Sequence, residues 1–82
     1  MKMLNQPISV LALFSHQGNI EPIAFKYRGR EYHIKKIKWW KFGGSVWLDK
    51  PSRIYCVYTR DEKVAELKWI IGTEEWVLIK LG

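Results

Sequence analysis

Cysteine is almost absent from this 82-residue sequence, and long apolar runs are missing altogether. Cys56 is the single cysteine, so no disulfide can form within the chain, which fits a reducing compartment. The run from Ile8 to Phe14 follows Lys2 as in a signal peptide, but it spans only seven residues and no small-x-small cleavage site follows it. No stretch approaches the roughly 20 apolar residues of a membrane helix. We therefore expect a cytoplasmic protein that makes no contact with a membrane.

The residues that form active sites and metal sites are also scarce. His16 and His33 are far apart and have no cysteine or acid at metal-ligand spacing. The serines lack a nucleophile-elbow context, and the glycine-rich stretch KFGGS has no Gly-Lys-Ser/Thr to cradle a phosphate. The paired acids at 61–62 and 74–75 lie in expected turns. The sequence predicts no enzyme, no metal, no cofactor and no small-molecule substrate.

Acidic residues are few, and their distribution leaves one segment strongly basic. Between Lys26 and Lys41 there are seven of the fourteen Lys and Arg but one of the eight acids, Glu31. The rest of the chain holds seven bases and seven acids, so the net charge of +6 belongs to this segment. Such a patch favours an anionic partner, although charge of this kind also keeps a small protein soluble.

Aromatic residues are abundant: five Trp, four Tyr and three Phe. A chain of this size buries only about 60–65% of its unfolded surface, and each aromatic ring can bury roughly 150–250 Å². About half of these residues would therefore suffice for a core, which leaves others free to contact a ligand.

Short segments rich in β-branched and aromatic residues alternate with turn signals, which predicts a single all-β domain over 1–82. We expect a strongly bent antiparallel sheet, or one closed as an SH3-like barrel, of five or six strands. The expected strands are 7–13, 21–27, 31–40, 53–59, 63–71 and 76–81. Segment 63–71 also has helical spacing, but its alternation and the hairpin that it completes favour a strand.

Alternation along the strands assigns side chains to two faces. A β-bulge near Lys35 and Lys36 would place both Ile37 and Trp39 on the core side, and Trp40 outside. Cys56 lies in an apolar segment, where we expect it to be buried and unreactive. The predicted inward residues are Ile8, Val10, Phe25, Tyr27, Tyr32, Ile34, Ile37, Cys56, Leu67, Trp69, Val77 and Ile79.

The outward face of the 26–42 hairpin is the candidate site, because it combines cations for phosphates with aromatics for unpaired bases. We predict contact with single-stranded or structured nucleic acid. The alternative partner is an acidic protein such as a polymerase, and a third interpretation leaves the face solvated with no ligand. The candidate residues are Lys26, Arg28, Arg30, His33, Lys35, Lys36, Lys38, Trp40, Lys41, Phe42 and Trp47.

Residues 21 to 81 resemble a small, uncharacterised all-β domain family of bacteria. The similarity rests on Pro22, Phe25, Arg28-Gly29-Arg30, Tyr32, Glu66-Leu67 and Trp76. Tyr27 stands where Trp is usual in the family, and Lys replaces much of the Arg. The members are often encoded beside Y-family translesion DNA polymerases and have no established activity. The resemblance implies an accessory role near DNA repair or replication.

Overall fold

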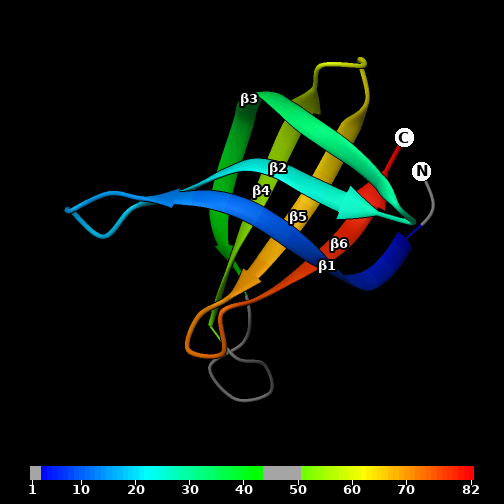
Figure 1. Ribbon diagram of the computed structural model, residues 1–82. Helices are drawn as coiled ribbons and strands as arrows, with labels where there is room; N and C mark the ends of the chain where they lie inside the picture. The colour runs from blue at the N-terminus through cyan, green and yellow to red at the C-terminus, as the bar shows by residue number, and fades with distance from the viewer. Residues whose placement is uncertain (1–2, 44–50) are drawn as a thin grey trace.

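The chain forms a closed, six-stranded antiparallel barrel, seen here in a computed structural model that describes residues 3–43 and 51–82. Each strand pairs with the next along the chain, and the last strand pairs with the first (Figure 1). The strands are β1 (Met3–Phe14), β2 (Ile20–Tyr27), β3 (Arg30–Gly43), β4 (Ser52–Thr59), β5 (Val64–Ile70) and β6 (Glu75–Leu81). The predicted all-β fold is confirmed, and segment 63–71 is a strand rather than a helix.

The turn between β2 and β3 is a two-residue hairpin turn. Tyr27 pairs with Arg30, and the two residues between them have positive φ, 52° for Arg28 and 76° for Gly29. This conformation matches the twist of the flanking strands and is easy for glycine. Arg28, which is not a glycine, shares this left-handed conformation with Gly29.

The core lies inside the barrel and is built largely from aromatic and branched side chains. Phe25 and Tyr32 stack face to face across the β2–β3 pair, with ring centroids 5.0 Å apart. Val57, Leu67 and Leu78 from β4, β5 and β6 are fully buried beside them. The core cluster is Ile20, Phe25, Tyr32, Tyr55, Val57, Ala65, Leu67, Trp76 and Leu78.

Nine of the twelve predicted inward residues belong to this core cluster or pack against it, and the other three, Cys56, Val77 and Ile79, do not. Cys56 is buried as predicted, but Tyr55 and Val57 on either side of it occupy the core. In β6 the cluster contains Trp76 and Leu78, whereas Ile79 is buried as predicted but lies outside the cluster, and Val77 is half-buried. Both strands are apolar on both faces, so alternation alone does not show which face is inside.

Strand β3 contains two bulges where the sequence predicted one. The register shifts between Ile34 and Lys36, as expected, and shifts again between Ile37 and Trp39. The second bulge reverses the alternation, so Trp40 pairs with the core residue Tyr55 and Trp39 pairs with Cys56 on the outer face. The predicted core-side orientation of Trp39 is therefore wrong, while Trp40, predicted outside, lies on the side of Tyr55 and is still 48% exposed.

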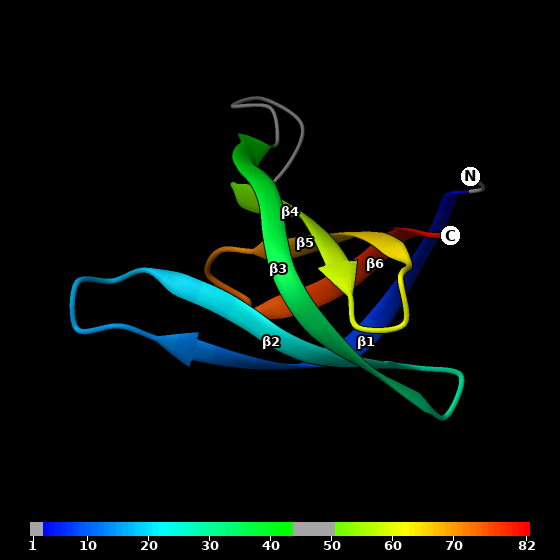
Figure 2. The same ribbon diagram turned by 90° about the horizontal axis from the view of Figure 1, so that it is seen from above.

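The long strands give the barrel two projecting ends. Seen from above, the β1–β2 hairpin leaves the barrel on one side, and the C-terminal half of β3 extends away from it with β4 (Figure 2). The pairing agrees, because β3 pairs with β2 only through Arg30–His33 and with β4 from Ile34 onward. Across 3–43 and 51–82, no helix is long and apolar enough to cross a membrane.

Candidate nucleic-acid interface

The cations at the β2–β3 hairpin end lie beside acidic residues. Arg30 forms an ion pair with Asp61 at 2.7 Å, and His33 lies 3.8 Å from Glu31. Lys26 pairs across the strands with the same Glu31. The positive charge expected here is thus partly neutralised, which weakens this end as a polyanion site.

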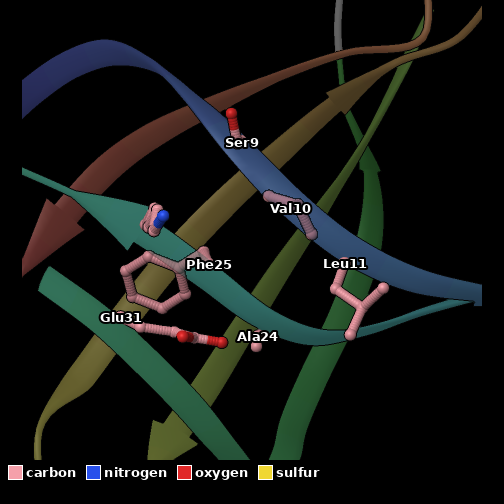
Figure 3. A pocket seen from close by; sticks show the side chains of 7 residues that line it. Ser9, Val10, Leu11, Ala24, Phe25 and Glu31 are labelled. Carbon is pink, nitrogen blue, oxygen red and sulfur yellow. The ribbon is translucent and has the colours of Figure 1, made fainter. Parts of the chain in front are cut away.

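Lys26 and Glu31 also line a recess of about 290 Å³ on the outer side of β1, β2 and β3 (Figure 3). The other lining residues are Ser9, Val10, Leu11, Ala24 and Phe25. The walls of the recess are mostly apolar, and its two charged residues, Lys26 and Glu31, have opposite signs. The recess therefore adds no excess of positive charge.

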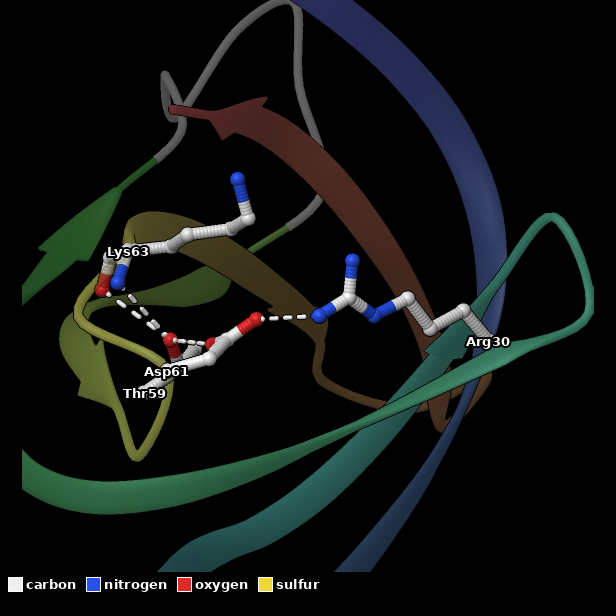
Figure 4. A network of polar contacts seen from close by, with 4 residues as sticks. All are labelled: Arg30, Thr59, Asp61 and Lys63. Atoms are coloured by element: carbon white, nitrogen blue, oxygen red, sulfur yellow. Dashed lines mark hydrogen bonds and ion pairs between the residues drawn. The ribbon is translucent and has the colours of Figure 1, made fainter.

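Arg30 is also held in place by a polar network in the β4–β5 turn (Figure 4). The Thr59 hydroxyl donates to one carboxylate oxygen of Asp61, while Arg30 donates to the other. The backbone N–H of Lys63 donates to the Thr59 hydroxyl at 3.0 Å. The Thr59 hydrogen bond lowers the pKa of Asp61, and Arg30 and Lys63 lower it further by charge. This network gives Arg30 a structural role.

The two arginines of the hairpin turn do not share a face with the lysines. The Arg28 guanidinium lies 5.4 Å from the ring centroid of Tyr27, and that of Arg30 lies 5.0 Å from Tyr32. Tyr32 belongs to the core and Tyr27 packs against it. The single basic face predicted from the sequence is therefore divided, with Arg28 and Arg30 on the side of these tyrosines.

The C-terminal half of β3 carries the main group of cations on the outer face of the barrel. Lys36 and Lys38 lie over the ring of Tyr58, with Nζ at 5.3 and 5.6 Å from its centroid, and Lys41 lies 5.4 Å from that of Trp39. Lys68 of β5 joins them, because Ile54 pairs with Lys41 on one side and with Lys68 on the other. We call this surface the lysine face; it comprises Lys36, Lys38, Lys41, Lys68, Trp39 and Tyr58.

The lysine face keeps its charge because its neighbouring acid is already paired. Glu66 of β5 lies next to Cys56 and forms an ion pair with Lys80 at 3.6 Å. No ion pair within residues 3–43 and 51–82 involves any lysine of the face. Cys56 lies beneath, and burial raises the pKa of its thiol, with a further contribution from Glu66. The surface is a cationic patch with aromatic rings between its charges.

A second feature lies on the inner side of the same strands, where one arginine is surrounded by aromatic rings. The guanidinium carbon of Arg53 is 5.1 Å from the ring centroid of Trp40, 5.4 Å from Phe42 and 6.0 Å from Trp69. Trp76 stacks on Trp69 at 6.2 Å. We call this group the Arg53 cluster; it comprises Phe14, Trp40, Phe42, Arg53, Tyr55, Trp69 and Trp76.

Within residues 3–43 and 51–82, two buried nitrogen donors of the Arg53 cluster have no hydrogen-bond partner, namely Nε of Arg53 and Nε1 of Trp69. A buried donor left unpaired costs about 1–3 kcal/mol. Contacts with aromatic faces offset part of this for Arg53, typically by about 0.5–2 kcal/mol each. Burial raises the pKa of the Tyr55 hydroxyl, and the neighbouring Arg53 opposes this rise. Arg53 is thus a cation held among aromatic rings, with its guanidinium beside the Tyr55 hydroxyl.

The structure brings together some of the predicted site residues and separates others. Lys36, Lys38 and Lys41 share the lysine face, whereas Trp40 and Phe42 belong to the Arg53 cluster. Lys35 is exposed at the first bulge. Lys26, Arg28, Arg30 and His33 form the more neutralised hairpin end. Trp47 lies outside the described residues.

Sequence reasoning missed Arg53, Lys68 and the outward position of Trp39. Alternation within β5 places Lys68 on the other face from Leu67 and Trp69, so its outward position could have been predicted. Its proximity to Lys41 could not, because it depends on the order of the strands in the sheet. Arg53 gave no comparable signal, because it lies at the edge of an apolar segment.

The part of the chain that the structure describes contains no group of three or more His, Cys, Asp or Glu placed to hold a metal ion. Comparisons with protein-family models, with curated proteins and with solved structures find no match for this chain.

Proposed function

We propose that this protein is a non-enzymatic module that binds single-stranded nucleic acid through one surface of the 26–42 segment, the lysine face. The observation that carries the proposal is the row of cations Lys36, Lys38 and Lys41 along one strand, with no acid paired to them in the described residues. Lys36 and Lys38 are two residues apart and Lys41 follows three residues later, so at about 3.3 Å per residue the row can follow an extended backbone.

Exposed aromatics support a single strand rather than a closed duplex. Trp39 is 37% exposed on the lysine face, and Trp40 and Phe42 are 48% and 67% exposed on the other side of the same strand. Stacking on an aromatic ring contributes about 1–3 kcal/mol for each unpaired base and requires no particular sequence. Paired bases within a duplex do not offer their faces in this way.

Salt dependence tests the proposal directly. Fluorescein-labelled dT12 and rU12 would be titrated with the protein at several salt concentrations, with anisotropy as the readout. Each phosphate contact on a single strand contributes about −0.7 to the slope of log K against log salt. Replacing Lys36, Lys38 and Lys41 together with Gln should make the slope shallower by about 2, since three contacts are lost.

A matched control removes the same charge from cations that lie beside acids: Lys26→Gln, Arg30→Gln and Lys80→Gln together. Lys26 faces Glu31, Arg30 is paired with Asp61, and Lys80 is paired with Glu66. We therefore expect the slope to change by less than about 0.7, the value for one phosphate contact. If the two triple variants change the slope equally, net charge rather than the lysine face attracts the strand. If the parent binds neither oligonucleotide, the proposal is wrong.

An acidic protein is the competing partner, because the same cations would complement carboxylates. This interpretation becomes the better one if the protein binds an acidic protein but binds neither dT12 nor rU12. A cytoplasmic accessory role near DNA repair is part of the proposal, and its support is the resemblance carried by residues 21 to 81.

A further inference from the structure

We propose that the unpaired edge of β3 over residues 39–43 is a docking site for an extended, acidic segment of a partner protein, which adds to the sheet as a further strand. The segment alternates acidic with apolar side chains. This inference goes beyond the proposed function and stands independently of it, because the backbone of β3 provides the site and no nucleic acid takes part.

The C-terminal half of β3 is paired along one edge only. The strand pairs with β2 through Arg30–His33, and from Ile34 onward it pairs with β4 alone. Seen from above, this half of β3 leads away from β2 (Figure 2). Its backbone N–H and C=O groups that face away from β4 therefore have no strand partner within residues 3–43 and 51–82. Groups of this kind can pair with another chain.

The exposure of the side chains agrees with an open edge. Every residue from Lys38 to Phe42 is exposed, whereas most of β4, which pairs on both sides, is buried. Residues 20–23 of β2 are also unpaired on the side of β3, but Ile20 and Pro22 there are buried, and proline has no N–H to donate. The edge of β3 is therefore the more accessible one.

Bulges and lysines commonly protect an exposed edge from pairing, and in β3 these devices cover only the first part of the edge. Both bulges lie before Trp39, and the pairing with β4 is then regular through Gly43. This regular stretch contains the aromatic residues Trp39, Trp40 and Phe42 and a single lysine, Lys41. A regular, largely apolar stretch of edge suits the addition of a strand.

The two faces of this stretch determine which side chains the added strand carries, because alternate residues of a strand belong to opposite faces. On the inner face, Trp40 and Phe42 offer apolar rings. On the outer face, Lys41 lies beside Trp39, and no acid of the described residues is paired with it. A strand with acids outside and apolar residues inside complements both faces.

A second copy of this chain complements the edge less well. Antiparallel pairing centred on Lys41 would set this lysine opposite its own counterpart, and like charges directly opposite one another destabilise a strand pair. Other registers would still bring together two basic segments that each carry a charge of +6. Charge therefore favours an acidic partner over self-association.

The test uses a fluorescein-labelled peptide of seven residues that alternates Glu and Val, with anisotropy as the readout. One control peptide alternates Lys and Val, and another has the same Glu and Val residues in a non-alternating order. We expect the parent protein to bind the alternating Glu/Val peptide more tightly than either control peptide.

Single substitutions test the two faces of the edge separately. Phe42→Ala should weaken binding of the Glu/Val peptide about fivefold, because a cross-strand apolar contact is lost. Lys41→Gln should weaken it about twofold to fivefold through loss of an exposed ion pair. The matched controls are Leu13→Ala, at a similarly exposed apolar residue of β1, and Lys80→Gln, at a lysine already paired with Glu66. Neither control should change the affinity.

Two further measurements distinguish strand addition from attraction by charge alone. Successive N–H groups of a strand point to opposite edges, so N-methylation of the Glu residues blocks one edge of the peptide and N-methylation of the Val residues blocks the other. Strand addition predicts that one of these two peptides loses binding and the other keeps it. Amide hydrogen exchange should also slow at alternate residues of 39–43 when the unmodified peptide is added, because unpaired N–H groups become hydrogen-bonded.

Four outcomes overturn the inference. Equal binding of the two N-methylated peptides, or unchanged hydrogen exchange at 39–43, would mean that charge alone holds the peptide. Parent affinity in both Phe42→Ala and Lys41→Gln would place the peptide elsewhere. Self-association with slow exchange at 39–43 in the absence of peptide would assign the edge to a second copy. A folded parent that binds no Glu/Val peptide would remove the docking site, whereas the proposed function is decided separately by dT12 and rU12. Thermal unfolding confirms that each variant is folded.

Discussion

The hydrogen bond from Tyr55 to the backbone of β2 offers a direct test of how β2 and β4 are held together across the barrel. Tyr55 is 2% exposed, and its hydroxyl donates to the carbonyl oxygen of Ile20 at 2.8 Å. Ile20 is the first residue of β2 and Tyr55 lies near the middle of β4, so this bond joins strands that do not pair with each other. Tyr55→Phe removes the hydroxyl and keeps the ring.

The expected loss of stability in Tyr55→Phe is that of one hydrogen bond, because the substitution keeps the ring. The ring contacts with Trp40 at 6.4 Å and Trp76 at 5.8 Å remain available to phenylalanine, so packing should change little. The loss of one buried hydrogen bond costs about 0.5–1.5 kcal/mol, with the upper part of this range expected because the acceptor is also buried. In a domain of this size 1 kcal/mol lowers Tm by about 4–8 °C.

Urea unfolding followed by tryptophan fluorescence measures the effect as a shift in midpoint at constant slope. Tyr58→Phe is the control, because Tyr58 is half-buried and its hydroxyl has no hydrogen bond within the described residues. Its effect should stay within about 0.5 kcal/mol. Equal losses in the two variants, or a loss below about 0.3 kcal/mol in Tyr55→Phe, would refute the structural role of this bond.

Three further predictions concern single positions. Because the folded-state pKa of Asp61 is lowered, its ionised form stabilises the fold above the ordinary pKa of about 3.9, and this contribution is lost as pH falls through the lower folded value. Asp61→Asn should therefore be less stable than the parent at neutral pH, and the difference should shrink below about pH 4 in urea unfolding at a series of pH values; a constant difference would contradict this. Gly29→Ala should destabilise the protein by about 1 kcal/mol or more because its φ is 76°, whereas Gly29→Asn should recover part of the loss, and equal stability of the two would contradict the turn assignment. Cys56 should react with a thiol reagent at neutral pH far more slowly than a free cysteine, because it is buried and its pKa is raised; rapid labelling of the folded protein would show otherwise.

The basic character of the 26–42 segment and its division between the two surfaces depend on different kinds of information. The excess of cations is visible in the sequence because charge is a property of residue type. Which cations stay without an acidic neighbour is not, since Asp61 lies 31 residues from Arg30 in the sequence and comes within 2.7 Å only through the β4–β5 turn. Strand register, rather than composition, therefore selects Lys36, Lys38 and Lys41.

Residue types and turn signals alone determined that this chain forms short antiparallel strands. Alternation identified the inner side chains of β5, such as Leu67, because Glu66 and Lys68 mark its outer face, and it identified Phe25 in β2, whose neighbour Lys26 is exposed. The first bulge in β3 was also predictable, since two adjacent lysines interrupt an otherwise apolar phase.

Tertiary structure decided the rest, because the remaining choices depend on contacts between distant strands. In β4 both faces are apolar, so only the closed barrel shows that Tyr55 and Val57 are inside and Cys56 is not. The second bulge turns Trp40 toward Tyr55 and Trp39 outward, a reversal that no local pattern signals. Arg53 gains its aromatic neighbours from β3 and β5, which pair with β4 on either side, so their positions depend on strand register rather than on local sequence.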